Sequence, residues 1–461
     1  MSTLGGILNT GREALLVQQL KMQIIGHNTA NVNTAGFSRR RLDLMTAPAI
    51  VNSNGWFYGS GVAVEDLRRI RDTVLDSQFR RTNTTLGYWT QLEDSMTRVE
   101  EVFNEFGGSA ISDHLQAFWD AWQDLANDPE SLSTRTNLIS RAQTLASSLN
   151  RVHNGLRSRR EELDLTLVQQ TGEINQLTAE IAALNVRIVN AEVSGGEAGD
   201  LRDRRDLLLD RLSEYVPITT HENDGGAVNV YLGGQILIQV DHAQVLEVAA
   251  YSEDNMTLHR VAWSGSGQPI PLGDGKLKAT LTARDQTIPN ALTKLNTFAT
   301  TLVQEVNNRH VTGYGLTGSN GFNFWDASTT GAGNIAVDAA IVADPRLIAA
   351  SSSADAPGDN SIALWIGQLQ TERLLDGGLS TLGNYYSNLA SALGSETSLA
   401  TERRTTEEAA TNLLEQRRQS VSGVSMDEEM ANLIMVQKCY EAAAKLISTV
   451  DEMMQTILAM V

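Results

Sequence analysis

The chain has 461 residues, of which 41% are hydrophobic and 20% are charged, so it is long enough for two to four domains with a sizeable core. Its formal net charge of −19 disfavours nonspecific binding to nucleic acid or to an anionic membrane, because both need a basic protein surface. Cys439 is the single cysteine, which excludes a disulfide framework.

The first thirty residues predict an amphipathic helix with a seven-residue repeat. Alternating steps of four and three residues reach a mostly apolar series: Leu4, Leu8, Gly11, Leu15, Gln18, Met22, Ile25, Thr29 and Val32. The segment shows no basic n-region or cleavage site of a secretory signal, and no apolar run approaches the ~18 residues that cross a bilayer. By these rules alone we expect a cytoplasmic protein.

The stretch HNTANVNTAGFSRRR, which starts at residue 27, interrupts that helix. Side chains such as those of Asn31, Asn33 and Thr34 bond to nearby backbone groups and so compete with helical hydrogen bonds. Gly36 permits a left-handed turn that residues with a Cβ resist. The stretch therefore predicts a helix stop at a defined residue and a change in chain direction.

Helical patterns dominate the next part of the chain. We expect helices from about residue 71, over 111–125, over 167–191 and over 201–215. The apolar residues Val62, Val64 and Leu67 lead into the first of them. Trp119 and Trp122 are typical of core anchors. The last two helices flank Ser194-Gly195-Gly196 and predict an antiparallel pair.

At Val216-Pro217 the hydrophobic period changes from helical to alternating. The segment GGAVNVYLGGQILIQV alternates around Gly233-Gly234, which predicts a hairpin. We expect an inserted β domain over 216–275 and a return to helix over 276–312, with Pro289 near an N-terminal turn or a kink. An irregular segment with short strands follows over 313–360, and helix again over 361–421.

The chain ends in a second amphipathic helix, for which Ser425 and Glu428 form a capping box after Gly423. Its apolar series is Leu433, Val436, Tyr440, Ala443, Ile447, Val450, Met454, Ile457 and Val461. Neither end helix can bury its stripe alone, so we expect both ends to be partly disordered until they find a partner. Residues 1–45 carry a net charge of +3 and residues 426–461 one of −4, which favours pairing of the two ends, in one molecule or between neighbours.

The sequence contains little that predicts chemistry. The seven histidines are scattered, and neither a G-x-S-x-G elbow nor a P-loop is present. Gly313–Gly318 matches G-x-G-x-x-G, but a helical pattern precedes it, so we interpret it as a bare turn. A run of acids and arginines is interpreted as ion pairs along a helix face rather than as a metal site: Asp200, Asp203, Asp206 and Asp210 with Arg202, Arg204, Arg205 and Arg211.

Two motifs resemble those of the flagellar axial proteins, the family of rod, hook and hook-associated proteins. The N-terminal motif A-N-x-N-T-x-G-[FY] is matched by Ala30, Asn31, Asn33, Thr34, Gly36 and Phe37. The C-terminal motif S-G-V-x-x-D-E-E-x-A-N-L-I is matched from Ser422 to Ile434. Ser38-Arg39, Arg284-Asp285-Gln286 and the run from Ile348 to Ser352 resemble the hook-associated members, and the resemblance extends over nearly the whole chain.

This resemblance implies a structural protein of the hook–filament junction that assembles helically and has neither enzymatic activity nor a cofactor. The implied fold is mainly α with an inserted β domain: terminal coiled-coil helices, a long helical-bundle middle domain and a small outward-facing β module. The terminal helices (1–45 and 422–461) would form an inner tube. The helical bundle would comprise 46–215, 276–312 and 361–421, with the β domain at 216–275 and the irregular segment, packed on the bundle, at 313–360.

The resemblance also implies partners and a location. The partners are further copies of the chain, the hook protein, hook-associated protein 3, and an export chaperone that covers the C-terminal helix. The location is outside the cell after export through the flagellar type III apparatus, without a cleaved signal peptide. The assembly contacts expected on this basis are Leu8, Leu15, Met22, Ile25, Asn31, Asn33, Thr34, Gly36, Phe37, Leu433, Val436, Tyr440, Ile447, Val450, Met454 and Ile457.

Two other functions remain open at this point. A hook or distal-rod protein shares the N-terminal motif, but the C-terminal motif and the long helical middle argue against it. A hydrolase carried in the β domain is the alternative from another class, and the lack of a clustered nucleophile, base or metal ligand argues against that.

Overall fold

The computed structural model describes residues 2–51, 57–105, 108–193 and 195–460. The α-helices are α1 (Ser2–Ala30), α2 (Thr73–Glu105), α3 (Gly108–Asn127), α4 (Leu132–Glu192), α5 (Gly199–Tyr215), α6 (Lys276–Thr282), α7 (Ile288–His310), α8 (Ala339–Ala343), α9 (Ser361–Gly367), α10 (Leu382–Ser422) and α11 (Met426–Ala459). The strands are β1 (Arg40–Thr46), β2 (Ile50–Val51), β3 (Phe57–Tyr58), β4 (Val62–Arg69), β5 (Ile218–Glu222), β6 (Val228–Leu232), β7 (Gln235–Gln239), β8 (His242–Ala243), β9 (Leu246–Glu253) and β10 (Met256–Trp263).

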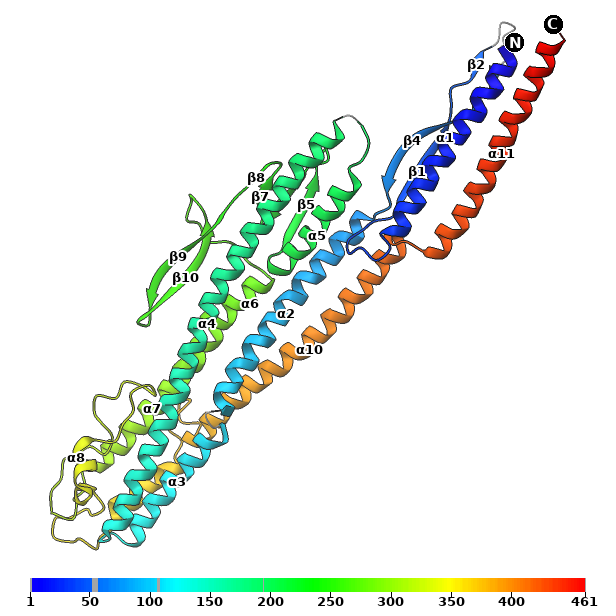
Figure 1. The fold of residues 1–461 in the computed structure, drawn as a ribbon. Helices are drawn as coiled ribbons and strands as arrows, with labels where there is room; N and C mark the ends of the chain where they lie inside the picture. The colour runs from blue at the N-terminus through cyan, green and yellow to red at the C-terminus, as the bar shows by residue number, and fades with distance from the viewer. Residues whose placement is uncertain (1, 52–56, 106–107, 194, 461) are drawn as a thin grey trace.

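The molecule is elongated, as Figure 1 shows. The pair α1 and α11 projects from one end, and both chain ends lie at its tip. A body of long helices follows, with the β strands β5 to β10 on one flank and the irregular segment around α8 at the far end. This arrangement confirms the expected fold class of a mainly helical chain with an inserted β module.

The body is organised by α4, a helix of 61 residues that begins at an N-cap on Ser131. Its buried residues change partner along its length. In its first half Leu138, Leu145 and Leu149 join a core with α3, α7 and α10. That core contains the predicted tryptophan anchors, since Trp119 and Trp122 are buried beside Phe118 and Phe324. The helix α4 thus borders two hydrophobic cores, this one and a second one that it shares with the β module.

In its second half α4 packs against the β module. Leu167, Ile174 and Ile181 share a core with Val230 and Leu232 of β6 and with other apolar residues of α5 and the module. The predicted hairpin around Gly233-Gly234 joins β6 to β7, and both glycines have positive φ (57° and 83°), as a tight two-residue turn of this kind requires. The strands β5 to β8 form one sheet in sequence order, and β9 and β10 form a separate two-stranded sheet. The module therefore depends on α4 and α5 for its core.

Asparagine side chains of α4 also hold this module by its backbone. Asn185 accepts from the Val228 N–H and donates to the Val228 carbonyl, with N···O distances of 3.1 and 2.8 Å. Asn175 makes the same pair of bonds with Leu246. Each amide replaces the hydrogen bonds that a neighbouring strand would supply, which satisfies buried backbone groups without another strand.

The sequence predicts that the helical bundle begins at residue 46, but the segment between the N-terminal turn and α2 contains strands. Residues 40–46 and 62–69 form an antiparallel hairpin, β1 with β4, and this hairpin packs on α1 rather than on the body helices. The alternation of Val62, Val64 and Leu67 belongs to strand β4, and the first body helix begins only at Thr73. We call α1, α11 and the strands β1–β4 the terminal unit.

A network of arginines and carboxylates joins the terminal unit to the body. Arg69, at the end of β4, contacts Asp203 and Asp206 of α5 at 2.8 and 3.0 Å. Further pairs continue the network into α2 and α10: Arg71 with Asp76 and Asp206, Arg80 with Asp206 and Asp210, and Arg418 with Asp76 and Asp210. The expected ion pairs of α5 are therefore present, but their partners come from other elements and not from the neighbouring arginines of α5.

Asp206 lies at the centre of this network and is buried. Burial acts to raise the pKa of its carboxyl group, but the guanidinium groups of Arg71, Arg69 and Arg80 outweigh burial and hold that pKa below its ordinary value. A carboxyl group whose pKa is lower in the folded than in the unfolded state stabilises the fold above the unfolded pKa. Its contribution is lost only as the pH falls through the lowered value.

This network predicts that Asp206→Asn destabilises the protein by about 3 kcal/mol at pH 7, because buried guanidinium groups lose their shared counter-charge. The matched control is Asp200→Asn in the same helix, whose carboxylate is largely exposed and pairs with Arg40, so its loss should cost less than about 1 kcal/mol. Urea unfolding monitored by circular dichroism measures both changes. Equal losses in the two variants would contradict a role for the buried network.

Candidate assembly interface

The helices α1 and α11 pack side by side in opposite directions, as seen in Figure 1. Near the tip, Gly11 lies against Ile447, so closely that a Cβ on Gly11 would come within 2.8 Å of the Ile447 side chain. Near the body, Asn28 bonds to Glu429. These two contacts fix an antiparallel register, so each end helix finds its partner in the other end of the same chain.

The predicted apolar stripe of α11 is the face that packs on α1. Val436 and Val450 are buried, whereas Leu433, Tyr440, Ile447 and Met454 are half-buried and Ile457 is exposed. On α1, Ile25 is buried and Leu8, Leu15 and Met22 are half-buried. The structure therefore brings these predicted contact residues together, although within one chain.

A second face of α1 was not anticipated from the sequence. Val17 and Ile24 pack with Leu42 of β1 in a separate small core, which Leu20 and Leu67 border. The sequence does contain a pattern that could have indicated this core. The α1 residues follow a helical spacing beside the main apolar stripe, and apolar residues alternate with polar ones along the strands. The hairpin thus covers a side of α1 that α11 leaves free.

The loop after α1 has the expected turn. The Asn31 amide donates to the His27 carbonyl, and its oxygen accepts from the Thr34 hydroxyl at 3.1 Å. Gly36 has φ = +78°, a conformation in which a Cβ would be strained. The Phe37 ring lies 5.4 Å from the His27 ring, whereas the Asn33 side chain is exposed. Asn31, Thr34 and Gly36 therefore shape the turn, and Asn33 is available to a neighbour.

Asn28 makes important contacts in this region but is not among the contact residues predicted from the sequence. Its side chain is 1% exposed, accepts from the Arg40 N–H at 3.0 Å, and donates to the Arg40 carbonyl at 3.0 Å and to the Glu429 carboxylate at 3.1 Å. One amide thus ties together α1, β1 and α11. A polar residue at the end of an apolar helix carries too weak a signal to reveal such a role.

Glu429 is itself only 4% exposed. Burial raises the pKa of its carboxyl group, although the Asn28 amide and the Arg39 guanidinium oppose the shift. The neighbouring Glu428 forms an ion pair with Arg39, whose backbone N–H donates to the carbonyl of Ser422 at the end of α10 at 2.8 Å. The first turn of α11 is therefore held by charge and hydrogen bonds as well as by apolar packing.

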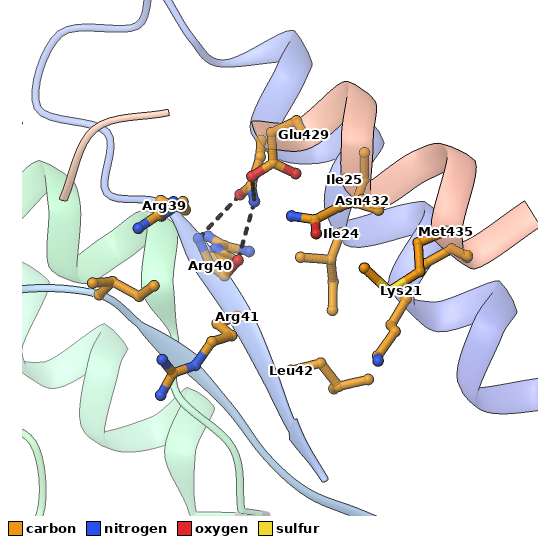
Figure 2. Close-up of a pocket in the computed structure, with 13 residues that line it drawn as sticks. Lys21, Ile24, Ile25, Arg39, Arg40, Arg41, Leu42, Glu429, Asn432 and Met435 are labelled. Atoms are coloured by element: carbon orange, nitrogen blue, oxygen red, sulfur yellow. Dashed lines mark hydrogen bonds between the residues drawn. The ribbon is translucent and has the colours of Figure 1, made fainter. Parts of the chain in front are cut away.

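A pocket of about 350 Å³ opens where α1, β1 and α11 meet (Figure 2). We call it the basal pocket. Its cationic residues are Lys21, Arg39, Arg40 and Arg41, and its apolar residues include Ile24, Ile25, Leu42 and Met435. Glu429 and Asn432 contribute its remaining polar groups. The pocket therefore combines positive charge with an apolar lining.

Apolar residues also lie on the sides of α11 that α1 does not cover. Met430, Ile434 and Met453 are between 52% and 57% exposed, whereas Leu446, which is 41% exposed, borders Gly11 of α1. Exposed apolar residues of this kind are typical of an interaction surface. The stripe predicted from the sequence is thus covered within the chain, and a different set of side chains is left for neighbouring molecules.

Neither a metal centre nor a membrane span is found in the part of the chain that the structure describes. Within it, no group of three or more histidine, cysteine, aspartate or glutamate side chains is arranged to hold a metal ion. No helix there combines the length and the apolar character needed to cross a bilayer.

Two family models match the chain. The model of the "Flagellar hook-associated protein FlgK helical domain" matches residues 96–325, which include α4, α5 and the β module. The model of the "Flagellar basal body rod FlgEFG protein C-terminal" matches residues 415–460, which include α11. The body and the C-terminal helix thus match separate models of flagellar proteins.

Whole-length relatives agree with these matches. Flagellar hook-associated protein 1 of Bacillus subtilis (strain 168) is 27% identical over an alignment that covers 98% of this chain and 97% of the relative. The protein of the same name from Salmonella typhimurium is 23% identical, with 99% of this chain and 100% of the relative covered. The structure of the flagellar hook junction protein FlgK from Burkholderia pseudomallei shares the fold, with a TM-score of 0.66, 16% identity, and coverage of 75% of this chain and 100% of that one. On the combined family models and full-length relatives, this chain belongs to the flagellar hook-associated protein 1 family.

Proposed function

We propose that the chain is a structural component of the bacterial flagellum that connects the hook to the filament and assembles helically with further copies through its terminal unit. The observation that carries this proposal is the surface of α11. One face is covered by α1, yet Met430, Ile434 and Met453 remain more than half exposed on its other sides. Burial of such side chains stabilises a contact by roughly 1.5–3 kcal/mol each, but only if a neighbouring molecule supplies the partner surface.

The hook protein and hook-associated protein 3 are the further axial partners in this proposal. An export chaperone would cover the exposed face of α11 before assembly, since an uncovered apolar face favours aggregation. The final location would be the flagellum outside the cell, after export through the flagellar type III apparatus. Family membership and the paired terminal helices support these assignments.

The other candidate functions are less well supported. A hook or distal-rod protein would account for the match over residues 415–460, but not for the match of residues 96–325 to the hook-associated helical domain. A hydrolase in the β module finds no support in the relatives, which are named as flagellar proteins. A hydrolase screen of the purified chain would test this alternative directly.

The proposal predicts that the purified protein binds at the tips of hooks from a strain that lacks its own junction protein. Immunogold electron microscopy would locate it, and filament growth from the decorated tips would show that the junction is functional. Labelling along the length of the hook, with bare tips, would instead indicate a hook or rod protein.

We expect Gly36→Val to impair hook-tip assembly strongly while the helical body stays folded. Gly36 adopts φ = +78°, which a β-branched residue resists, and a Cβ there would approach Leu207 of α5 at 3.4 Å. Ala35→Val is the matched control, because it adds the same side chain at an adjacent exposed position. Hook-tip binding and thermal unfolding of both variants give the comparison. Equal assembly of the two would contradict a requirement for the left-handed turn.

Asn28→Asp is expected to loosen the terminal unit at neutral pH, because it removes the donor to Glu429 and places a second carboxylate beside it. Repulsion between the two carboxylates raises the pKa of both groups in the folded state of this variant. The stabilising contribution of the protonated groups is therefore fully present below the unfolded pKa of about 4.3, and it is lost as the pH rises through the raised folded-state pKa. Hydrogen exchange in α11 should therefore be faster than in the wild type at pH 7 and approach it near pH 4. Asn33→Asp, at the exposed loop position, should match the wild type at both pH values. A pH-independent change in Asn28→Asp would refute this explanation.

A further inference from the structure

We propose that neighbouring copies of the terminal unit meet head to tail. In this contact the basal pocket of one copy receives Asp427, Met430 and Ile434 from the outer side of α11 in the next copy. The inference rests on the proposed self-assembly and names the two surfaces that carry it.

The basal pocket has the chemistry of a receptor for an acidic side chain flanked by apolar ones. Lys21 lines it from α1, and the structure assigns this ammonium group no ion pair or hydrogen bond with any described residue. Arg41 lines it from β1 and is largely exposed, with Asp43 as its intramolecular partner. Leu42 and Met435 supply apolar surface beside these cations (Figure 2). The volume of about 350 Å³ is sufficient for two or three side chains.

The outer side of α11 carries the complementary set. At about 100° per residue, Asp427, Met430 and Ile434 lie on the side of the helix opposite to its pocket-lining residues. Met430 is 52% exposed, Ile434 is 57% exposed, and Asp427 is exposed. A row of one carboxylate followed by two large apolar side chains thus faces away from the molecule, where no described part of the chain covers it.

The placement of the two surfaces favours a second copy as the occupant. Glu429 lies in the wall of the pocket, and Asp427 and Met430 are within one helical turn of it, so the two surfaces overlap in height on the terminal unit. They also lie on opposite sides of α11. The antiparallel register places Lys21 opposite about Val436, so a contact between Lys21 and Asp427 leads sideways from copy to copy with a shift of about 13 Å along the helix axis. Repeated head-to-tail contacts with such a shift build helical layers.

The charge distribution of the chain also favours a contact between two copies. Residues 1–45 carry a net charge of +3 and residues 426–461 one of −4. Within one copy, Arg39 already pairs with Glu428, whereas Lys21 and Asp427 lie on opposite sides of α11 and cannot pair. Complementary charges between copies set the register of such an interface and disfavour wrong partners.

Charge reversal tests the contact in the full-length chain. Lys21→Glu and Asp427→Lys should each lower the amount of protein assembled at hook tips by about tenfold, which corresponds to about 1.4 kcal/mol. The double variant Lys21→Glu/Asp427→Lys should restore assembly to within about twofold of the wild type, because the pair is re-formed with its charges exchanged. Lys294→Glu, at an exposed position of α7 in the body, makes the same charge change and should assemble normally.

The outcomes separate this inference from the proposed function. If the wild type binds hook tips but the double variant is not rescued, or if Lys21→Glu lowers assembly while Asp427→Lys leaves it unchanged, the pocket does not receive Asp427 of another copy and the inference is overturned. If the wild type itself does not bind hook tips, the proposed self-assembly fails and the inference fails with it. Thermal unfolding of each variant confirms that the terminal unit remains folded.

Cross-linking supplies an independent measurement. In a Cys439→Ser background, Lys21→Cys combined with Asp427→Cys should give a ladder of covalent multimers when assembled protein is treated with a short bismaleimide. The single-cysteine variants should give no species larger than a dimer, because a ladder needs both surfaces on every copy. An assembled sample of the double-cysteine variant without such a ladder would overturn the proposed contact.

Discussion

The buried pairing of Arg69 with Asp203 and Asp206 determines how the two parts of this molecule are held together. Taking charges out of water is costly, so a buried pair is stable only when geometry and further hydrogen bonds are complete. Here the additional arginines of α2 and α10 and the Ser38 backbone N–H, which donates to Asp203, provide that completeness. The terminal unit is therefore joined to the body by a polar contact in which the buried charges are paired.

A second recurring device is a buried or half-buried asparagine on a helix. Among the described residues, four such amides bond to both the N–H and the carbonyl of one residue in another element: Asn28 with Arg40, Asn175 with Leu246, Asn185 with Val228, and Asn307 with Trp325. An amide side chain can do this because it carries a donor and an acceptor side by side. Long helices, which have no free backbone hydrogen bonds along their sides, can thus anchor strands and loops.

The sequence predicted the features that depend on local periodicity and on special backbone conformations. The apolar stripe from Leu433 to Met454 and the positive φ of Gly36 follow from rules that act over a few residues. The pairing of β1 with β4 across α1, the partners of Asp206 and the role of Asn28 depend on which distant segments meet. A single polar residue such as Asn28 has many possible partners, and only the tertiary arrangement selects one. For this reason the site was predicted less completely than the fold.

The bond between Asn28 and Glu429 joins residues that are 401 positions apart in the chain. During synthesis α1 is therefore made long before α11 exists, and the terminal unit can close only after α11 has been produced. The entropy of closing a loop rises slowly with its length, so this separation affects the order of events more than the final stability. The two helices of the terminal unit are thus translated far apart in time, and a chain that stops before α11 lacks the helix that packs on α1.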